Sequence, residues 1–165
     1  MLTATTYLAP SLASRLRCTI GVLFLISFTT AAQGQQPSRY VVTPQFTDGA
    51  SSVHAADIDG DGDNDLLSAS NRDDKIAWYE NFEGEIGSQQ IISVDANQPE
   101  SVHAADLDGD GDLDVLSASY QSNELAWYEN LDGTRDFSSK KVIATDGTWD
   151  VFAADLDGDG DMDVL

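Results

Sequence analysis

The sequence predicts an all-β protein built from four-stranded antiparallel blades of the β-propeller type. A motif rich in aspartate and glycine occurs three times, with first aspartates at Asp57, Asp106 and Asp155, so both steps are 49 residues. Short β-branched and aromatic runs flank the motif, and no stretch after residue 34 has convincing helical periodicity. A period of this length is typical of solenoids, propellers and arrays.

One period contains four expected strands. Val53–Ala56 precedes the aspartate motif, and Leu66–Ser70 follows it. Asn71–Asp74 is polar and predicts a turn. Ile76–Tyr79 is apolar and aromatic, and Gln90–Val94 is β-branched at its centre, so both are expected as strands. Four strands in one period match the size of a propeller blade.

The expected ring of blades is incomplete. About 2.5 repeats are present, whereas propellers have roughly 4 to 8 blades. The segment RYVVTPQFT (residues 39–47) resembles QQIISVDAN (residues 89–97), so the repeat region is expected to open with the last strand of a blade. The third copy stops just inside its second strand. We therefore expect an N-terminal fragment of a longer protein, truncated at its C-terminus.

Residues 1–34 have the layout of a secretory signal peptide. They contain no Asp or Glu; Arg15 and Arg17 precede the apolar run Cys18–Phe28, and small residues follow it. The run is too short for a transmembrane helix, which needs about 20 residues. A buried helix or an uncleaved anchor is the alternative. We expect a mature repeat domain over residues 35–165, secreted to an extracellular or periplasmic location, with no membrane span after cleavage.

The charge is strongly unbalanced, with 29 Asp and Glu against 8 Lys and Arg and a formal net charge of −21. Removing residues 1–34 takes away two cations and the single cysteine, leaving 29 acids, 6 cations and a net charge of −23. A polyanion repels nucleic acid and anionic lipid surfaces, so neither is an expected partner. The mature chain can form no disulfide, although an exported protein enters a compartment that permits them.

Fifteen of the 29 acids lie in three nine-residue loops. Within each loop, carboxylates stand at positions 1, 3, 5 and 9 and glycines at positions 4 and 6, where they allow the backbone to reverse without a Cβ clash. Position 7 would turn its backbone carbonyl toward the centre. Five oxygen donors and water suit Ca²⁺ better than Mg²⁺, and the absence of Cys and His at ligand spacing disfavours zinc and copper.

We therefore predict up to three calcium sites, one in each loop. The candidate metal ligands are Asp57, Asp59, Asp61, Asp63 and Asp65; Asp106, Asp108, Asp110, Asp112 and Asp114; and Asp155, Asp157, Asp159, Asp161 and Asp163.

Two other interpretations of the loops are weaker. An acidic solvated turn would leave four or five carboxylates repelling one another at close range. An EF-hand shares positions 1, 3, 5 and 6, but it needs a glutamate at position 12 and flanking helices. Position 12 is Ser68 in the first copy and Ser117 in the second, and the flanking segments are expected strands.

The segments HAADIDGDGDNDLLSAS and HAADLDGDGDLDVLSAS resemble the FG-GAP/VCBS-type repeats of integrin-α-like propellers. The resemblance covers about residues 40–165. It implies a β-propeller whose calcium loop joins the first two strands of each blade, with ligation from positions 1, 3, 5, 7 and 9. Asp63, Asp112 and Asp161 would then act through the backbone carbonyl. The Phe-Gly and Gly-Ala-Pro signatures are missing, so integrin-like ligand binding is not implied.

Other recurring residues are interpreted as structural. His54 and His103 precede their loops by three residues, but the third copy has Phe152 there, which favours packing over metal binding or catalysis. No Ser-His-Asp arrangement can be argued from the recurring serines. Four aromatic residues at strand spacing are expected in the blade core, although they could also stack on sugar rings. These are Trp78, Tyr79, Trp127 and Tyr128.

Two functions are compatible with this sequence. The first is a secreted, non-catalytic, calcium-stabilised scaffold for protein or glycan interaction and adhesion. The alternative is the repeat portion of a secreted hydrolase or lyase whose catalytic residues lie beyond residue 165. Nothing in residues 35–165 indicates a reaction, so no enzyme activity is predicted for this chain.

Overall fold

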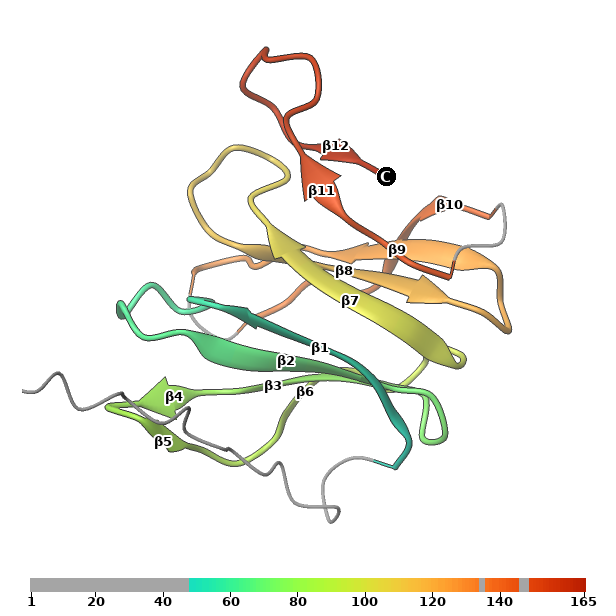
Figure 1. Cartoon of the computed structure of the whole chain (residues 1–165), viewed down its shortest axis with the longest axis horizontal. Coiled ribbons are helices and arrows are strands. Elements are labelled where there is room, and N and C mark those ends of the chain that lie inside the picture. Colours follow the sequence, from blue (N-terminus) through green and yellow to red (C-terminus); the bar gives the residue numbers. More distant parts are fainter. Residues whose placement is uncertain (1–47, 134–135, 146–148) are drawn as a thin grey trace, which may run out of the picture. The chain divides into compact units, whose positions relative to one another are not determined.

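The computed structural model describes residues 48–133, 136–145 and 149–165, which belong to one compact unit, Ser38–Leu165. The predicted signal peptide at 1–34 and the expected strand within 39–47 lie outside the described residues. The described part is all-β, with antiparallel sheets and no helix (Figure 1). It therefore contains no helix long and apolar enough to cross a membrane. The predicted fold class is confirmed.

The first repeat forms a four-stranded antiparallel sheet in the order β1-β2-β3-β6. Its strands are β1 (Ala50–Ala56), β2 (Asp65–Ser70), β3 (Lys75–Tyr79) and β6 (Gln90–Ser93). Each lies within three residues of the expected strand. The alternation of apolar side chains between the two faces explains why the strand positions could be predicted.

A small hairpin between β3 and β6 was not predicted. It consists of β4 (Asn81–Phe82) and β5 (Glu85–Ile86), joined by two residues with positive φ, Glu83 at 52° and Gly84 at 91°. Two left-handed residues in a two-residue loop are typical of a hairpin turn whose twist matches its strands. Two-residue strands are too short to give a periodic signal, so only the Glu-Gly pair could have indicated the hairpin.

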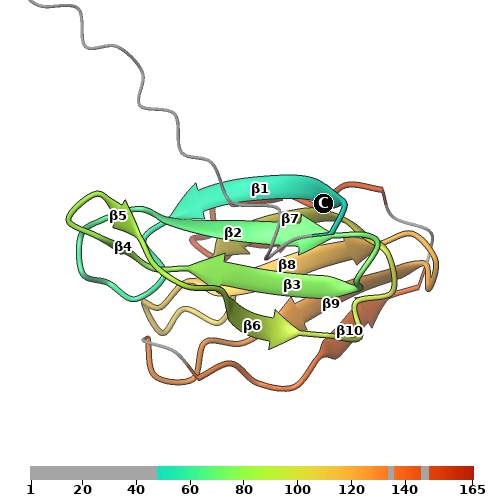
Figure 2. The ribbon, with the colours of Figure 1, turned by 90° about the horizontal axis from the view of Figure 1, so that it is seen from below.

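The second repeat forms a sheet of the same topology, in the order β7-β8-β9-β10. Its strands are β7 (Pro99–Ala105), β8 (Asp114–Ser119), β9 (Glu124–Tyr128) and β10 (Lys141–Ala144). The register also repeats, because Ala55 pairs with Leu66 and Ala104 pairs with Val115. In both repeats the four strands follow one another across the sheet as a meander (Figure 2).

The third repeat contributes a pair of two-residue strands, β11 (Ala153–Ala154) and β12 (Asp163–Val164). The sheets do not close into a ring, as the repeat count predicted. The described structure is therefore two blades and the beginning of a third.

The second sheet is buried on both faces. One face joins a core cluster with the first sheet, in which Trp78 and Leu67 pack with Val115 and Tyr128. The other face packs against the third repeat, with Leu116 of β8 and Val151 in one cluster. Neighbouring residues such as Val115 and Leu116 point to opposite faces, and both are fully buried, so blade stacking supplies most of the core.

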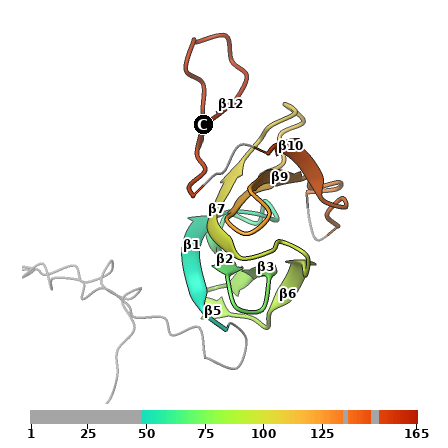
Figure 3. The same ribbon diagram turned by 90° about the vertical axis from the view of Figure 1, so that its right-hand side faces the viewer.

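The first strands of the repeats are neighbours: β1 lies beside β7 (Figure 3), and β11 lies on the other side of β7 (Figure 1). Along them, the rings of His54 and His103 lie 4.4 Å apart, and those of His103 and Phe152 lie 4.7 Å apart. Burial lowers the pKa of both histidines, and repulsion from His54 lowers that of His103 further. Neither histidine joins a potential metal cluster in the described residues. The interpretation of these histidines as packing residues agrees with this arrangement.

The predicted aromatic core is largely confirmed. Trp78, Tyr79 and Tyr128 are each 1% exposed. Trp127 is only half-buried, and the Lys141 ammonium lies 4.2 Å from the centre of its ring. Three of the four aromatic side chains are therefore withdrawn from any ligand.

Candidate metal centres

Three aspartate loops connect the first and second strands of their repeats. The first loop is Asp57–Asp65, the second is 106–114 and the third is 155–163. Glycines at positions 4 and 6 have positive φ in every loop; Gly60 and Gly62, for example, have φ values of 71° and 98°. No other atom lies within 4 Å of a Cβ built at either glycine. Glycine is therefore favoured there because of the positive φ, and not because a side chain would clash.

The carboxylate at position 1 is held by glycine amides inside its own loop. Asp106 accepts hydrogen bonds from Gly109 N at 2.8 Å and Gly111 N at 3.0 Å. Asp155 makes the equivalent pair with Gly158 N and Gly160 N. The loop backbone thus curls around its first carboxylate, and this conformation is set within nine residues.

Each loop brings three carboxylates together. In each group, one oxygen per residue lies within 4.8 Å of the others, close enough to hold one metal ion. The groups are Asp57, Asp59 and Asp61; Asp106, Asp108 and Asp114; and Asp155, Asp157 and Asp163. Positions 1 and 3 converge in every loop, and position 5 or position 9 completes the group.

Position 7 differs from the other candidate positions, because none of its side chains joins a group. Asp63 Oδ2 instead accepts a hydrogen bond from Glu83 N at 3.0 Å, in the turn of the β4–β5 hairpin. The Asp112 carboxylate lies against Gly133, where an added Cβ would approach it to 2.4 Å. In the first two loops the position-7 side chain therefore contacts a neighbouring turn, and ligation through the position-7 backbone carbonyl stays a prediction.

Position 9 is the most buried acid of the first two loops. Asp65 is 0% exposed and Asp114 is 1% exposed. Asp114 Oδ2 accepts from Leu107 N at 3.0 Å and its Oδ1 accepts from Asn130 N at 2.9 Å. Asp65 is held in the same way by Ile58 N and Asn81 N. This carboxylate therefore ties its loop to the end of the third strand.

In the first and second loops, the acid at position 3 has a raised pKa. Burial raises the pKa of Asp59, and repulsion from Asp61 raises it further. Burial and then repulsion from Asp110 raise the pKa of Asp108 in the same way. In both cases the free energy of the charged form rises because negative charges lie close together in a partly desolvated loop. A bound divalent cation would reverse this effect.

The donor chemistry fits a hard cation. Asp57 Oδ1 and Asp59 Oδ1 are buried, and neither has a hydrogen-bond partner in the described structure. A buried carboxylate oxygen without a partner is costly, and a cation between the two would remove that cost. Only oxygens converge in the three groups, and an all-oxygen set of this kind suits Ca²⁺.

Two asparagines support the loops and were missed by sequence reasoning. Asn81 and Asn130 directly follow the repeated Trp-Tyr-Glu segment and donate their backbone amides to position 9. Asn130 Nδ2 also donates to Leu113 O at 3.3 Å and, across the repeat boundary, to Ile58 O of the first loop at 3.0 Å. The recurrence of the asparagine with a 49-residue step was the available signal.

Two glutamates extend the negative field of the loops. Glu80 contributes to the raised pKa of Asp59, after burial and Asp61, and Glu129 contributes to that of Asp108 after burial and Asp110. Glu129 also pairs with Lys141. These glutamates directly follow the third strands, β3 and β9, so the end of the adjoining strand adds negative charge to the first and second candidate metal centres.

The comparisons with known proteins agree with the repeat pattern. The family model for the FG-GAP-like repeat matches this chain twice, over residues 57–117 and 106–165. No curated protein matches the chain significantly. Each match begins at the first aspartate of one loop and extends past the next loop, so each matched stretch includes two candidate metal centres and the strands between them.

Proposed function

Because the chain belongs to the FG-GAP-like repeat family, we propose that it is a secreted, calcium-stabilised scaffold that presents its loops to an extracellular protein or glycan. FG-GAP repeats form β-propeller-like domains, and the family is generally non-catalytic and commonly extracellular. The apolar segment Cys18–Phe28, with its basic flank, supports export.

The observation that carries this proposal is the convergence of three carboxylates in each loop. Asp57, Asp59 and Asp61 would hold calcium in the first loop, with Asp65 and the position-7 carbonyl as further oxygen donors. The equivalent positions would serve in the other two loops. The ion would supply positive charge at the point where each loop concentrates its acids. It would act structurally, by stabilising the loop that joins two strands of a blade.

Calcium at each site is expected to raise the free energy of unfolding modestly, and the three contributions together would stabilise the fold. Extracellular calcium sites have Kd values of about 10⁻⁴–10⁻³ M. At ~1 mM calcium and a Kd of ~0.1 mM, each site adds roughly 1.4 kcal/mol by mass action. Three such sites matter for a mature chain that contains no cysteine.

A thermal melt tests the proposal. The full chain should melt at a clearly higher temperature in 1 mM calcium than in excess chelator, and magnesium at the same concentration should restore only a small part of the difference. Equal melting temperatures in calcium and in chelator would refute calcium stabilisation. Export is tested separately, because appearance of the chain outside the cytoplasm should require residues 1–34.

A further inference from the structure

An exposed aromatic pair lies at the boundary between the second and third repeats. Tyr120 begins the turn that joins β8 to β9, and Trp149 precedes β11. Their ring centres are 4.3 Å apart, with planes inclined at 35°. Tyr120 is 44% exposed and Trp149 is 63% exposed. Two large rings are thus held together at the surface while much of their area faces solvent.

The preceding repeat boundary shows that the fold does not require aromatic residues there. The positions 49 residues earlier are Asn71 and Glu100, and Asn71 Nδ2 donates a hydrogen bond to Glu100 Oε1 at 3.2 Å. A polar pair therefore makes the same contact between repeats without exposing apolar surface. The aromatic pair is specific to the second boundary, and packing between repeats does not explain it.

The surroundings of Tyr120 are polar and concave. Tyr120, Gln121 and Asn123 line a shallow hollow of about 200 Å³ beside the pair. Each of the two amide side chains offers both a hydrogen-bond donor and an acceptor. An apolar surface that adjoins a few polar groups in a concavity is the usual composition of a small-molecule site.

We propose that the Tyr120–Trp149 pair and the adjoining hollow form a binding site for a neutral sugar ring. The C–H face of a pyranose would lie on an exposed aromatic face, and its hydroxyl groups would exchange hydrogen bonds with Gln121 and Asn123. An apolar peptide side chain would satisfy neither amide. The formal net charge of −21 disfavours acidic or sulfated sugars. The inference rests on the proposed extracellular scaffold and identifies the class of its ligand.

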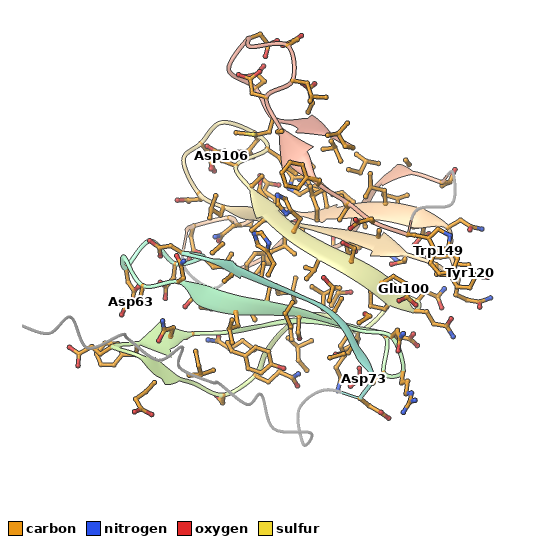
Figure 4. All side chains as sticks on the ribbon, viewed as in Figure 1. Asp63, Asp73, Glu100, Asp106, Tyr120 and Trp149 are labelled. Atoms are coloured by element: carbon orange, nitrogen blue, oxygen red, sulfur yellow. The ribbon has the colours of Figure 1, made fainter. Side chains whose placement is uncertain are left out.

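The site lies away from the metal loops. Figure 4 shows Tyr120 and Trp149 beside Glu100 at one end of the molecule, whereas Asp63 and Asp106 lie at the other. The antiparallel topology explains this separation, because the aspartate loops join first to second strands and the Tyr120 turn joins the second strand to the third. Sugar binding at the pair would therefore involve no contact with calcium.

The test uses the full chain in calcium. Linear β-linked glucose oligosaccharides and α-linked mannose oligosaccharides are titrated while tryptophan fluorescence and heat are recorded. Of the three tryptophans, Trp78 is buried, Trp127 is half-buried and Trp149 is 63% exposed, so a fluorescence change that is lost in Trp149→Ala reports on the pair. Trp149→Ala and Tyr120→Ala should each weaken binding by at least about tenfold. Phe82→Ala removes a comparably exposed ring, 62% accessible, and should leave binding unchanged.

Each outcome decides the inference. Binding of either neutral oligosaccharide, lost in the two pair variants and kept in Phe82→Ala, supports it. Failure of both neutral sugars to bind, binding that Trp149→Ala does not weaken, or binding only of polygalacturonate or a lysine-rich peptide would overturn it. The calcium-dependent melt is measured on every variant. A retained calcium shift without sugar binding rejects this inference alone, whereas loss of the shift in the unaltered chain rejects the proposed function.

Discussion

The second and third aspartate loops have nearly the same sequence but different surroundings. Both hold their first carboxylate with the amides of two glycines. In the second loop, however, Asp114 is buried and accepts hydrogen bonds from Leu107 N and Asn130 N. In the third, Asp163 is exposed, and of the described residues Leu156 alone donates to it.

The comparison of the two loops shows which features the loop sequence sets and which depend on the rest of the blade. The nine residues of a loop set its own hydrogen bonds, since the bond from the position-6 glycine amide to the position-1 carboxylate recurs in all three loops. Burial of the ninth carboxylate depends on the end of the third strand, where Asn81 and Asn130 stand in the first two repeats. A single loop can therefore adopt its shape alone, whereas a complete blade fixes the position-9 carboxylate.

The largest expected effect comes from removing the position-9 acid in the second loop. Asp114→Ala leaves two amides without their acceptor in a buried site and should cost about 2–4 kcal/mol of unfolding free energy. Asp163→Ala, the matched control, removes the same residue type from an exposed position and in chelator should cost less than about 1 kcal/mol. In calcium, each variant should also lose the contribution of its own metal site. Urea unfolding in calcium and in chelator measures both variants. Similar losses in the two variants would show that the burial of Asp114 contributes little.

A smaller effect is expected at the repeat boundary. Asn130→Ala removes buried side-chain hydrogen bonds to Leu113 O and to Ile58 O of the preceding loop, and should cost about 2 kcal/mol. Asn81→Ala removes two exposed hydrogen bonds, from Asn81 Nδ2 to Asn64 O and from Gly84 N to Asn81 Oδ1, and should cost at most about 1 kcal/mol. Urea unfolding again compares the two. A larger loss in Asn81→Ala would mean that the contact between repeats is not the stabilising one.

The smallest effect concerns pH and the neighbouring rings of His54 and His103. The pKa values of His54 and His103 are lowered, by burial in both cases, and for His103 also by His54; Asp150 opposes the shift at His103. The unfolded chain therefore binds these protons at higher pH than the folded chain. Stability from the neutral rings is present above about pH 6.5 and is lost as pH falls below that value.

The third repeat supplies the control for this pH effect. Phe152 already occupies the equivalent position, so His54→Phe with His103→Phe replaces both histidines with a residue that the stack accepts. The double variant should lose less stability than the unaltered chain between pH 7 and pH 5 in a chemical denaturation series. Carboxylate titration is common to both proteins and cancels in the difference. Parallel curves would contradict a role for the histidines.

The strands and the metal loops could be predicted because their signals are local. The alternation in Val53–Ala56, the polar turn at Asn71–Asp74 and the glycines of the loops each follow from neighbouring residues. The convergence of Asp57, Asp59 and Asp61 in one loop also follows from a nine-residue pattern. These are the parts of the fold that repeat with the 49-residue step.

Contacts between repeats could not be predicted in the same way. Asn130 reaches Ile58 from 72 residues away, and Tyr120 meets Trp149 only because neighbouring blades stack. The repeat comparison in the sequence showed that Phe152 replaces a histidine, but not that its ring completes a stack with His103. Long-range contacts of this kind depend on how blades pack, for which a single sequence carries no periodic signal.

Calorimetric titration of the full chain with calcium tests the central claim most directly. The account predicts up to three ions bound per chain, and Asp108→Asn, which changes one member of the second group, should remove one of them. The first and third groups lie in separate loops and should bind as before. A chain that takes up no calcium, or a stoichiometry that Asp108→Asn leaves unchanged, would contradict the assignment of these loops as metal centres.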